Sequence, residues 1–91
     1  MKRKKFIGLK YEPDVDVAPR ICFKIHTSNS DFFVKVLENY KIPLIKDEIL
    51  TSILDKIPLN WEIPKELYFT IAKIYGILYK DGYLKKKSNQ N

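Results

Sequence analysis

The residue types that most often carry catalysis or bind metals are few in this chain and do not cluster. The only histidine, His26, falls in a polar turn, and no serine or cysteine beside it has an obvious third partner. The single cysteine, Cys22, can form neither an internal disulfide nor a metal site alone, and its apolar neighbours predict a buried structural thiol. Asp14 and Asp16 in one loop are weak support for a cation site. The sequence also lacks a glycine-rich phosphate-binding motif, so we expect no enzyme activity, no cofactor and no metal.

Basic residues gather at the two ends of the chain. The formal net charge is +6, and seven of the 17 lysines and arginines stand at residues 2–5 and 85–87. The other ten face 11 acidic residues, so the body of the chain is close to neutral. A nucleic-acid-binding domain usually carries its positive charge as a patch on the folded surface. The pattern favours solvated ends, while an anionic membrane surface, an acidic partner and nucleic acid stay open as alternatives.

The length of 91 residues predicts one domain with a modest core. No apolar run is long enough to cross a bilayer, and none follows the basic N-terminal cluster as a signal peptide would require. We therefore expect a cytoplasmic protein. The domain should cover residues 6–84, between a basic N-terminal tail at residues 1–5 and a basic and polar C-terminal tail at residues 85–91.

A helix over residues 63–80 is the strongest pattern in the sequence. One row of its side chains recurs at helical spacing and should be buried: Leu67, Ile71, Ile74 and Leu78. Beside it runs a second row of small and aromatic residues, suited to a core edge or a contact surface: Tyr68, Ala72, Tyr75 and Tyr79. Pro64 suits the first helical turn, and Gly82 can supply the left-handed residue that ends the helix.

The rest of the chain alternates between strand and helix patterns. Alternating apolar residues predict strands at residues 6–11 and 20–25, and a third short strand is expected at residues 42–46. Helical spacing predicts a helix at residues 31–40, and Asp47 is a good N-cap for another. The order strand, strand, helix, strand, helix, helix predicts a small α/β domain. Its sheet should be mixed and three-stranded, with one parallel pair, and surrounded by three helices.

Four stretches carry a resemblance to a known family. Residues 6–14 read Phe-Ile-Gly-Leu-Lys-Tyr-Glu-Pro-Asp, and Ala18-Pro19-Arg20 follows, which is similar to A-V-A-L-K-Y-D-P and A-P-K in the family. Residues 38–47, Glu-Asn-Tyr-Lys-Ile-Pro-Leu-Ile-Lys-Asp, resemble K-E-H-G-I-P-I-Y-E-D, and residues 62–68, Glu-Ile-Pro-Lys-Glu-Leu-Tyr, resemble E-I-P-E-E-L-Y. The order and spacing resemble the cytoplasmic C-terminal domain of the flagellar export-switch protein FlhB, which YscU-type proteins of injectisomes share.

The resemblance also points to two differences from the family. Family members carry a large transmembrane region before this domain and cut themselves within an Asn-Pro-Thr-His loop just before the first matching strand. Here that tetrapeptide would fall on residues 1–4, Met-Lys-Arg-Lys, so the asparagine that attacks its own backbone is absent. We therefore expect no self-cleavage, and a stand-alone protein that is similar to the fragment left after cleavage.

The resemblance implies a binding role in the bacterial flagellar type III export apparatus. Partners would be export-apparatus components and early export substrates at the inner-membrane export gate, with the membrane part of FlhB as a further candidate, and the role would be substrate recognition and specificity switching. The family's docking patch falls on Ala18, Pro19, Ala72 and Tyr75, where Tyr75 replaces a more usual leucine. No small-molecule substrate is implied. The alternative is a small regulator that binds nucleic acid or another acidic partner through its basic tails.

Overall fold

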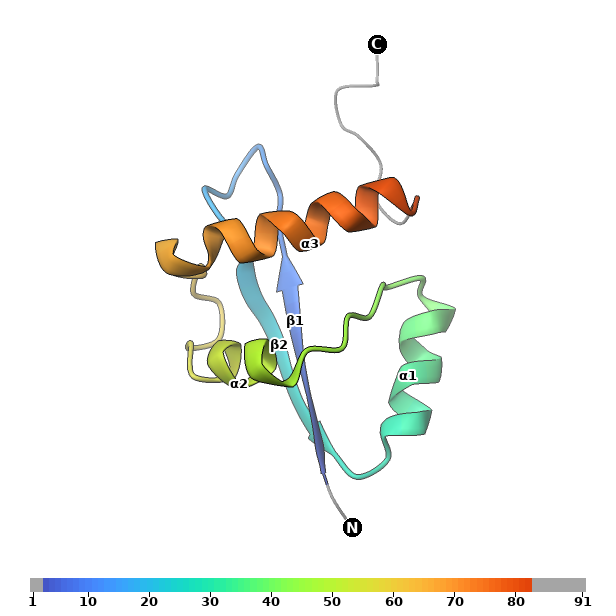
Figure 1. Ribbon diagram of the computed structural model, residues 1–91. Coiled ribbons are helices and arrows are strands. Elements are labelled where there is room, and N and C mark those ends of the chain that lie inside the picture. The colour runs from blue at the N-terminus through green and yellow to red at the C-terminus, as the bar shows by residue number, and fades with distance from the viewer. Residues whose placement is uncertain (1–2, 83–91) are drawn as a thin grey trace.

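The fold is built on a pair of antiparallel strands. The structure, a computed structural model, describes residues 3–82; β1 spans Lys4–Lys10 and β2 spans Arg20–Thr27 (Figure 1). Phe6 lies opposite Ile25 and Gly8 opposite Phe23, and the register shifts at a bulge between Gly8 and Leu9. Alternating aromatic and β-branched residues favour this pairing because they fill both sides of the pleat.

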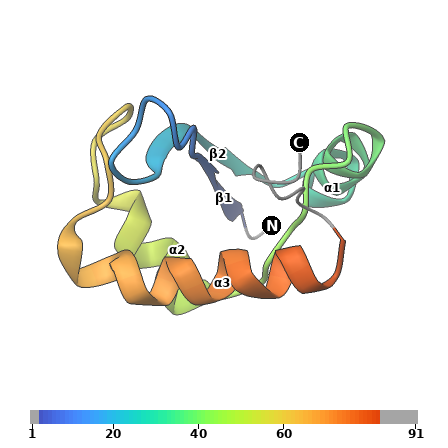
Figure 2. The ribbon, with the colours of Figure 1, turned by 90° about the horizontal axis from the view of Figure 1, so that it is seen from above.

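Three helices surround the two strands. They are α1 (Ser30–Asn39), α2 (Glu48–Asp55) and α3 (Tyr68–Lys80). Figure 2 shows α2 and α3 on the same side of the sheet, with α1 at the far end of the molecule. The small α/β domain with three helices is thus as expected, and α2 and α3 cover one face of the sheet.

Local signals in the sequence account for the helix ends. The Asp47 side chain accepts a hydrogen bond from the Leu50 N–H at 3.0 Å, which confirms it as the N-cap of α2. Gly82 has φ of +84° and ends α3, as expected. The helix starts later than predicted, because residues after Pro64 first form a 3₁₀ turn, η1 (Lys65–Leu67), and only then continue as α3.

The main core forms where α2 and α3 meet β2. Its buried members form one cluster: Ala18, Ile21, Leu50, Leu54, Ile63 and Ile71. Ile21 is 0 % exposed and Ile71 2 % exposed, so each contributes about 1.5–3 kcal/mol by leaving water. The predicted row on α3 is confirmed at Ile71 and Leu78, which are buried, whereas Leu67 and Ile74 are partly buried against the cluster.

A separate aromatic group attaches α1 to the strands. The Phe33 ring of α1 lies 4.7 Å from that of Phe6 and 6.1 Å from that of Phe23, both edge to face. The Phe23 ring lies over Gly8, where a Cβ would collide with it. The glycine therefore makes room for the aromatic group.

Asp55, at the end of α2, ties this helix to both strands. Its carboxylate lies 3.2 Å from the Lys5 ammonium and 3.4 Å from His26 Nε2, and its backbone carbonyl accepts a hydrogen bond from Lys24 at 2.7 Å. The hydrogen bond from Lys5 lowers the pKa of Asp55, and His26 adds to the effect. His26 therefore lies at the end of β2 beside a carboxylate.

The expected third strand at residues 42–46 does not form, so the parallel pair with β2 is also wrong. Lys41 has φ of +58° and turns the chain out of α1, and the Ile42 N–H bonds back to the Leu37 carbonyl. Pro43 has no N–H to donate. The segment runs between α1 and α2 without pairing (Figure 1). The sheet in the described part of the chain has two strands, not three.

The structure differs from the sequence-based expectations at the N-terminal tail and at Cys22. Lys4 and Lys5, assigned to a tail, pair with Thr27 and His26 at the start of β1, whereas residues 85–91 lie outside the described part. Cys22 is exposed rather than buried, because its side chain faces away from the core side of β2. Within residues 3–82, no helix has the length and apolar character needed to span a membrane.

Candidate binding site

A shallow apolar hollow lies where the loop between β1 and β2 meets α3. Its volume is about 210 Å³. The residues around it come from the loop, from the segment before η1 and from the start of α3: Tyr11, Val17, Ala18, Pro19, Ile63, Tyr68, Ile71, Ala72 and Tyr75. No formally charged side chain lines it. A hollow of this kind suits an apolar side chain from another molecule.

The four residues singled out in the sequence all border this hollow. Ala18 is buried in the core cluster at 2 % exposure, and Pro19 is half-buried beside it. Ala72 is exposed and Tyr75 is half-buried, on neighbouring turns of α3. Ala18 therefore forms part of the floor, whereas Ala72 is open to an approaching partner.

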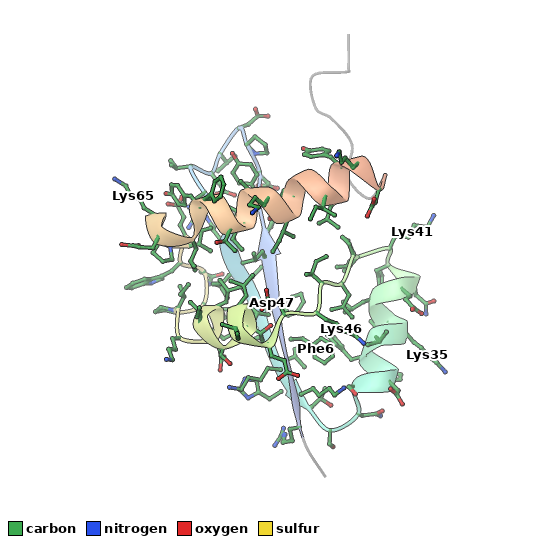
Figure 3. All side chains as sticks on the ribbon, in the orientation of Figure 1. Phe6, Lys35, Lys41, Lys46, Asp47 and Lys65 are labelled. Atoms are coloured by element: carbon green, nitrogen blue, oxygen red, sulfur yellow. The ribbon has the colours of Figure 1, made fainter. Side chains whose placement is uncertain are left out.

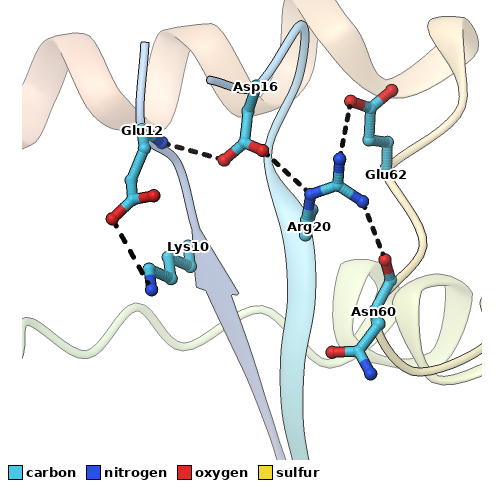
Figure 4. A network of polar contacts seen from close by, with 6 residues as sticks. All are labelled: Lys10, Glu12, Asp16, Arg20, Asn60 and Glu62. Atoms are coloured by element: carbon cyan, nitrogen blue, oxygen red, sulfur yellow. Dashed lines mark hydrogen bonds and ion pairs between the residues drawn. The ribbon is translucent and has the colours of Figure 1, made fainter. Parts of the chain in front are cut away.

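A polar network holds the loop in this shape (Figure 4). Asp16 is buried, its Oδ2 accepts a hydrogen bond from the Glu12 N–H at 3.0 Å, and its Oδ1 accepts one from Arg20 Nε at 2.9 Å. The hydrogen bond from Arg20 lowers the pKa of Asp16, and the Glu12 N–H adds to the shift. A buried carboxylate that stays ionised in this way fixes the backbone on both sides of Ala18 and Pro19.

Arg20 extends the network to the segment before α3. Its guanidinium donates to the Asn60 carbonyl at 3.0 Å and lies 3.4 Å from the Glu62 carboxylate. Backbone bonds run alongside, including one from the Ile63 N–H to the Pro19 carbonyl at 2.9 Å. The two walls of the hollow are therefore joined by hydrogen bonds as well as by apolar packing.

Tyr75 gives the hollow an aromatic wall. Its ring is stacked on that of Tyr11, with centroids 6.2 Å apart and planes 25° apart. Burial raises the pKa of Tyr75 to about 12, so its hydroxyl is neutral at physiological pH. Where the resemblance implies a leucine, this chain offers a wider surface that ends in a hydroxyl.

The hollow has lining residues beyond Ile71 and the four that the resemblance implied. Tyr11, Val17, Ile63 and Tyr68 also line the hollow. Tyr68 belongs to the second row of side chains, which the sequence already indicated as a core edge or a contact surface. Val17, which is 79 % exposed, gave no signal, because a lone valine in a loop has no periodicity to mark it.

The described residues show no other arrangement suited to chemistry. Residues 3–82 contain no group of three or more His, Cys, Asp or Glu side chains that could hold a metal ion. Of the two loop acids, Asp16 has its carboxylate engaged by Arg20 and by the Glu12 N–H. The arrangement around Ala18 and Pro19 is thus an apolar hollow, held in shape by the ion pair between Asp16 and Arg20.

Comparisons with known proteins identify the class of domain. No protein-family model matches the chain. In structure it is similar to a mutated EscU/SpaS C-terminal domain, with a TM-score of 0.74 and 22 % identity over 84 % of this chain and 95 % of the other. The PscU C-terminal domain gives a TM-score of 0.69 and 20 % identity over 81 % and 95 % of the two chains. These crystal structures establish the fold.

Two relatives are similar in sequence. The flagellar biosynthetic protein FlhB of Aquifex aeolicus is 32 % identical over 76 residues, which cover 81 % of this chain and 22 % of FlhB. The uncharacterized protein YlqH of Bacillus subtilis is 28 % identical over 85 residues, or 92 % of this chain and 91 % of YlqH. Sequence and fold together make the chain a FlhB-like C-terminal domain, which confirms the resemblance, and it spans about a fifth of FlhB itself.

Proposed function

We propose that the chain is a non-enzymatic, protein-binding module of the bacterial flagellar type III export apparatus. It would act in the cytoplasm, at the inner-membrane export gate, and help to recognise export substrates and switch between them. Support comes from its similarity to the flagellar biosynthetic protein FlhB and from the fold that it shares with EscU and PscU C-terminal domains. Its partners would be export-apparatus components and early export substrates.

The observation that carries this proposal is the hollow bordered by Ala18, Pro19, Ala72 and Tyr75. It is apolar, small and open, and the fold positions it without any partner. A docking segment would bury well under the roughly 1,200 Å² typical of stable interfaces, so binding should be weak and short-lived. Weak binding suits an export gate, because each substrate has to leave again.

The alternative, binding of nucleic acid through basic tails, has less support from the described residues. Arg3 donates a hydrogen bond to the His26 carbonyl at 2.8 Å, and Lys5 lies 3.2 Å from Asp55. Two members of the N-terminal cluster are thus engaged with the fold. The cluster at residues 85–87 lies outside the described part, so it has to be tested by experiment.

Complementation separates the two functions. The chain is expressed in a flagellated strain whose own FlhB lacks its C-terminal domain, and secretion of hook and filament subunits is measured. We expect partial restoration, and we expect it to persist when Lys2, Lys85, Lys86 and Lys87 are replaced by glutamine. Failure of the unaltered chain to restore secretion would contradict the export function. Loss only in the glutamine variant, with nucleic-acid affinity that falls steeply with salt, would favour the alternative.

A further inference from the structure

The outer edge of β1 is unpaired. Within residues 3–82, β1 pairs with β2 alone, and no backbone hydrogen bond reaches its other edge. In an antiparallel pair, every second residue of an edge strand points its N–H and C=O away from its partner. The start of β2 differs, because Ile21 exchanges backbone hydrogen bonds with Asn60 and Trp61 at 2.8 and 3.0 Å.

The segment at residues 42–46 is also unpaired. Leu44, Ile45 and Lys46 make no backbone hydrogen bond to any described residue. The Leu44 side chain is 40 % exposed and that of Ile45 44 % exposed, although both are large and apolar. The segment thus offers unused donors and acceptors beside apolar side chains, which is the pattern of a strand without its neighbour.

Both unpaired segments border one groove. Its volume is about 1870 Å³, above the roughly 300–1,000 Å³ of typical small-molecule pockets. Residues 3–9 and 42–48 all line it, without a gap in either run. Successive side chains of an extended chain point to opposite faces, so an unbroken run of lining residues is the pattern expected where a groove follows the edge of the segment. Figure 3 labels one residue from each of these walls, Phe6 of β1 and Lys46 of the segment.

We propose that this groove receives an extended segment of another polypeptide, which adds to the edge of β1 and lies between β1 and residues 42–46. The guest supplies the backbone partners that both walls lack, so the sheet grows by a strand from outside. The site is separate from the hollow at Ala18, Pro19 and Ala72, although Tyr11, Ile71 and Tyr75 border both. The inference therefore goes beyond the proposed function and can be tested apart from it.

The lining defines the chemistry of the guest. Apolar side chains from β1, the segment and α3 face the groove, among them Ile7, Leu9, Leu44, Ile45 and Ile74, so the guest needs apolar residues at alternate positions. Its end beside residues 3–5 meets Lys4, together with Arg3 and Lys5, which also contact the His26 carbonyl and Asp55 within the fold. Acidic residues at that end of the guest complement this charge.

Hydrogen exchange tests the free edge without any guest. In the full chain, alternate amides of residues 4–10 should exchange at least about tenfold faster than their neighbours that face β2, because only the latter are in the ladder. The amides of residues 44–46 should be as fast. Uniform protection along β1 that is independent of protein concentration and survives deletion of residues 83–91 would show that the edge is already covered and overturn the proposal.

A synthetic peptide tests the guest. The probe alternates valine with threonine and carries two glutamates at one end; its matched control has two adjacent prolines in the middle, which remove donors on both edges. We expect the probe, at saturation, to slow the fast amides of β1 and residues 44–46 by about tenfold or more, and the control to leave them unchanged. No slowing with the probe, or equal slowing with both, contradicts the proposal.

Proline substitutions test the second wall. Leu44→Pro and Ile45→Pro each remove one N–H that makes no backbone hydrogen bond within residues 3–82, one and two positions after Pro43, which the segment already tolerates. Successive N–H groups point to opposite sides, so one of the two proline substitutions should weaken probe binding about fivefold or more. The control substitutions Leu44→Thr and Ile45→Thr keep the N–H and should weaken binding less. If neither proline weakens binding, the guest does not lie against this segment.

Two other occupants would give different results. If a second copy of the chain fills the groove, protection of β1 rises with protein concentration and a dimer appears in sedimentation. If residues 83–91 fill it, protection is present in the full chain and is lost when they are deleted. Either result assigns the groove to this protein itself and overturns the proposal of a foreign strand.

Discussion

Asp16 and Arg20 form an ion pair across the loop that carries Ala18 and Pro19. Arg20 Nε lies 2.9 Å from Asp16 Oδ1. This contact holds together the two ends of the short stretch that contains Ala18 and Pro19. The same guanidinium reaches Asn60 and Glu62, so one side chain links the loop to the segment that leads into α3. The shape of the hollow depends on this pair as much as on the apolar residues that line it.

Acid should loosen the loop and destabilise the fold. The folded-state pKa values of Asp16 and Asp55 are lowered by hydrogen bonds from Arg20 and Lys5. A lowered pKa adds stability that is complete above the unfolded-state value, about 3.9 for aspartate, and is lost as the pH falls through the folded-state value. We expect the melting temperature to decrease as the pH drops below about 4, and to decrease less steeply in the Asp16→Asn variant.

The control for this prediction is Glu38→Gln, on the exposed side of α1. It should leave the acid limb of the melting curve unchanged. If Asp16→Asn has the same acid limb as the unaltered protein, the contact with Arg20 adds nothing to stability.

Ile71 should carry a large share of the stability of the core. Its side chain is 2 % exposed and belongs to the main cluster, so Ile71→Ala should cost on the order of 2–5 kcal/mol. Ile77→Ala, on the exposed side of the same helix at 54 % exposure, should cost less than about 1 kcal/mol. Urea unfolding measures both. Equal effects would mean that α3 faces the core with another side.

Gly8→Ala should destabilise the protein although it reduces the freedom of the unfolded chain. A methyl group at Gly8 meets the ring of Phe23, which packs in turn against Phe33. The expected cost is about 1–3 kcal/mol, the range for overpacking. Phe23→Leu in the same chain should recover part of it. A more stable Gly8→Ala variant would show that the ring moves aside freely.

The chain should not cut itself. The sequence contains no Asn-Pro-Thr-His, and β1 already starts at Lys4, where that loop would stand. Mass spectrometry after long incubation at neutral pH should show the full-length mass alone. Spontaneous scission near the N-terminus would contradict the proposal that the chain is a binding module without catalysis.

Much of the fold followed from periodicity and from helix caps. Apolar spacing located α3 and its buried face, and Asp47 and Gly82 marked helix ends, because a cap is a local property of one or two residues. The prediction of a strand at residues 42–46 was wrong because a strand forms only when another segment of the chain pairs with it. The apolar residues were recognised, but no described segment lies against them to pair.

The site was only partly predictable for a similar reason. Ala18, Pro19, Ala72 and Tyr75 came from the resemblance, and the structure brings all four to one hollow. The sequence indicated Asp16 only as half of a weak candidate cation site with Asp14, because its bonds to Arg20 and Glu12 appear only when the loop is folded. A short acidic loop gives no sequence signal for such a contact.

The exposed Ala72 offers the most direct measurement of the central claim, that the hollow binds export substrates. Ala72→Asp places a charge in the apolar rim, and Thr70→Asp places the same charge on α3 outside it. Both variants should melt within a few degrees of the unaltered protein, since both positions are exposed, and their binding to hook and rod subunits is compared by NMR titration. We predict that Ala72→Asp weakens binding at least about tenfold, and Thr70→Asp less than about twofold. Full binding by a folded Ala72→Asp, or a melting temperature that collapses because Ala72 belongs to the core, would contradict the claim.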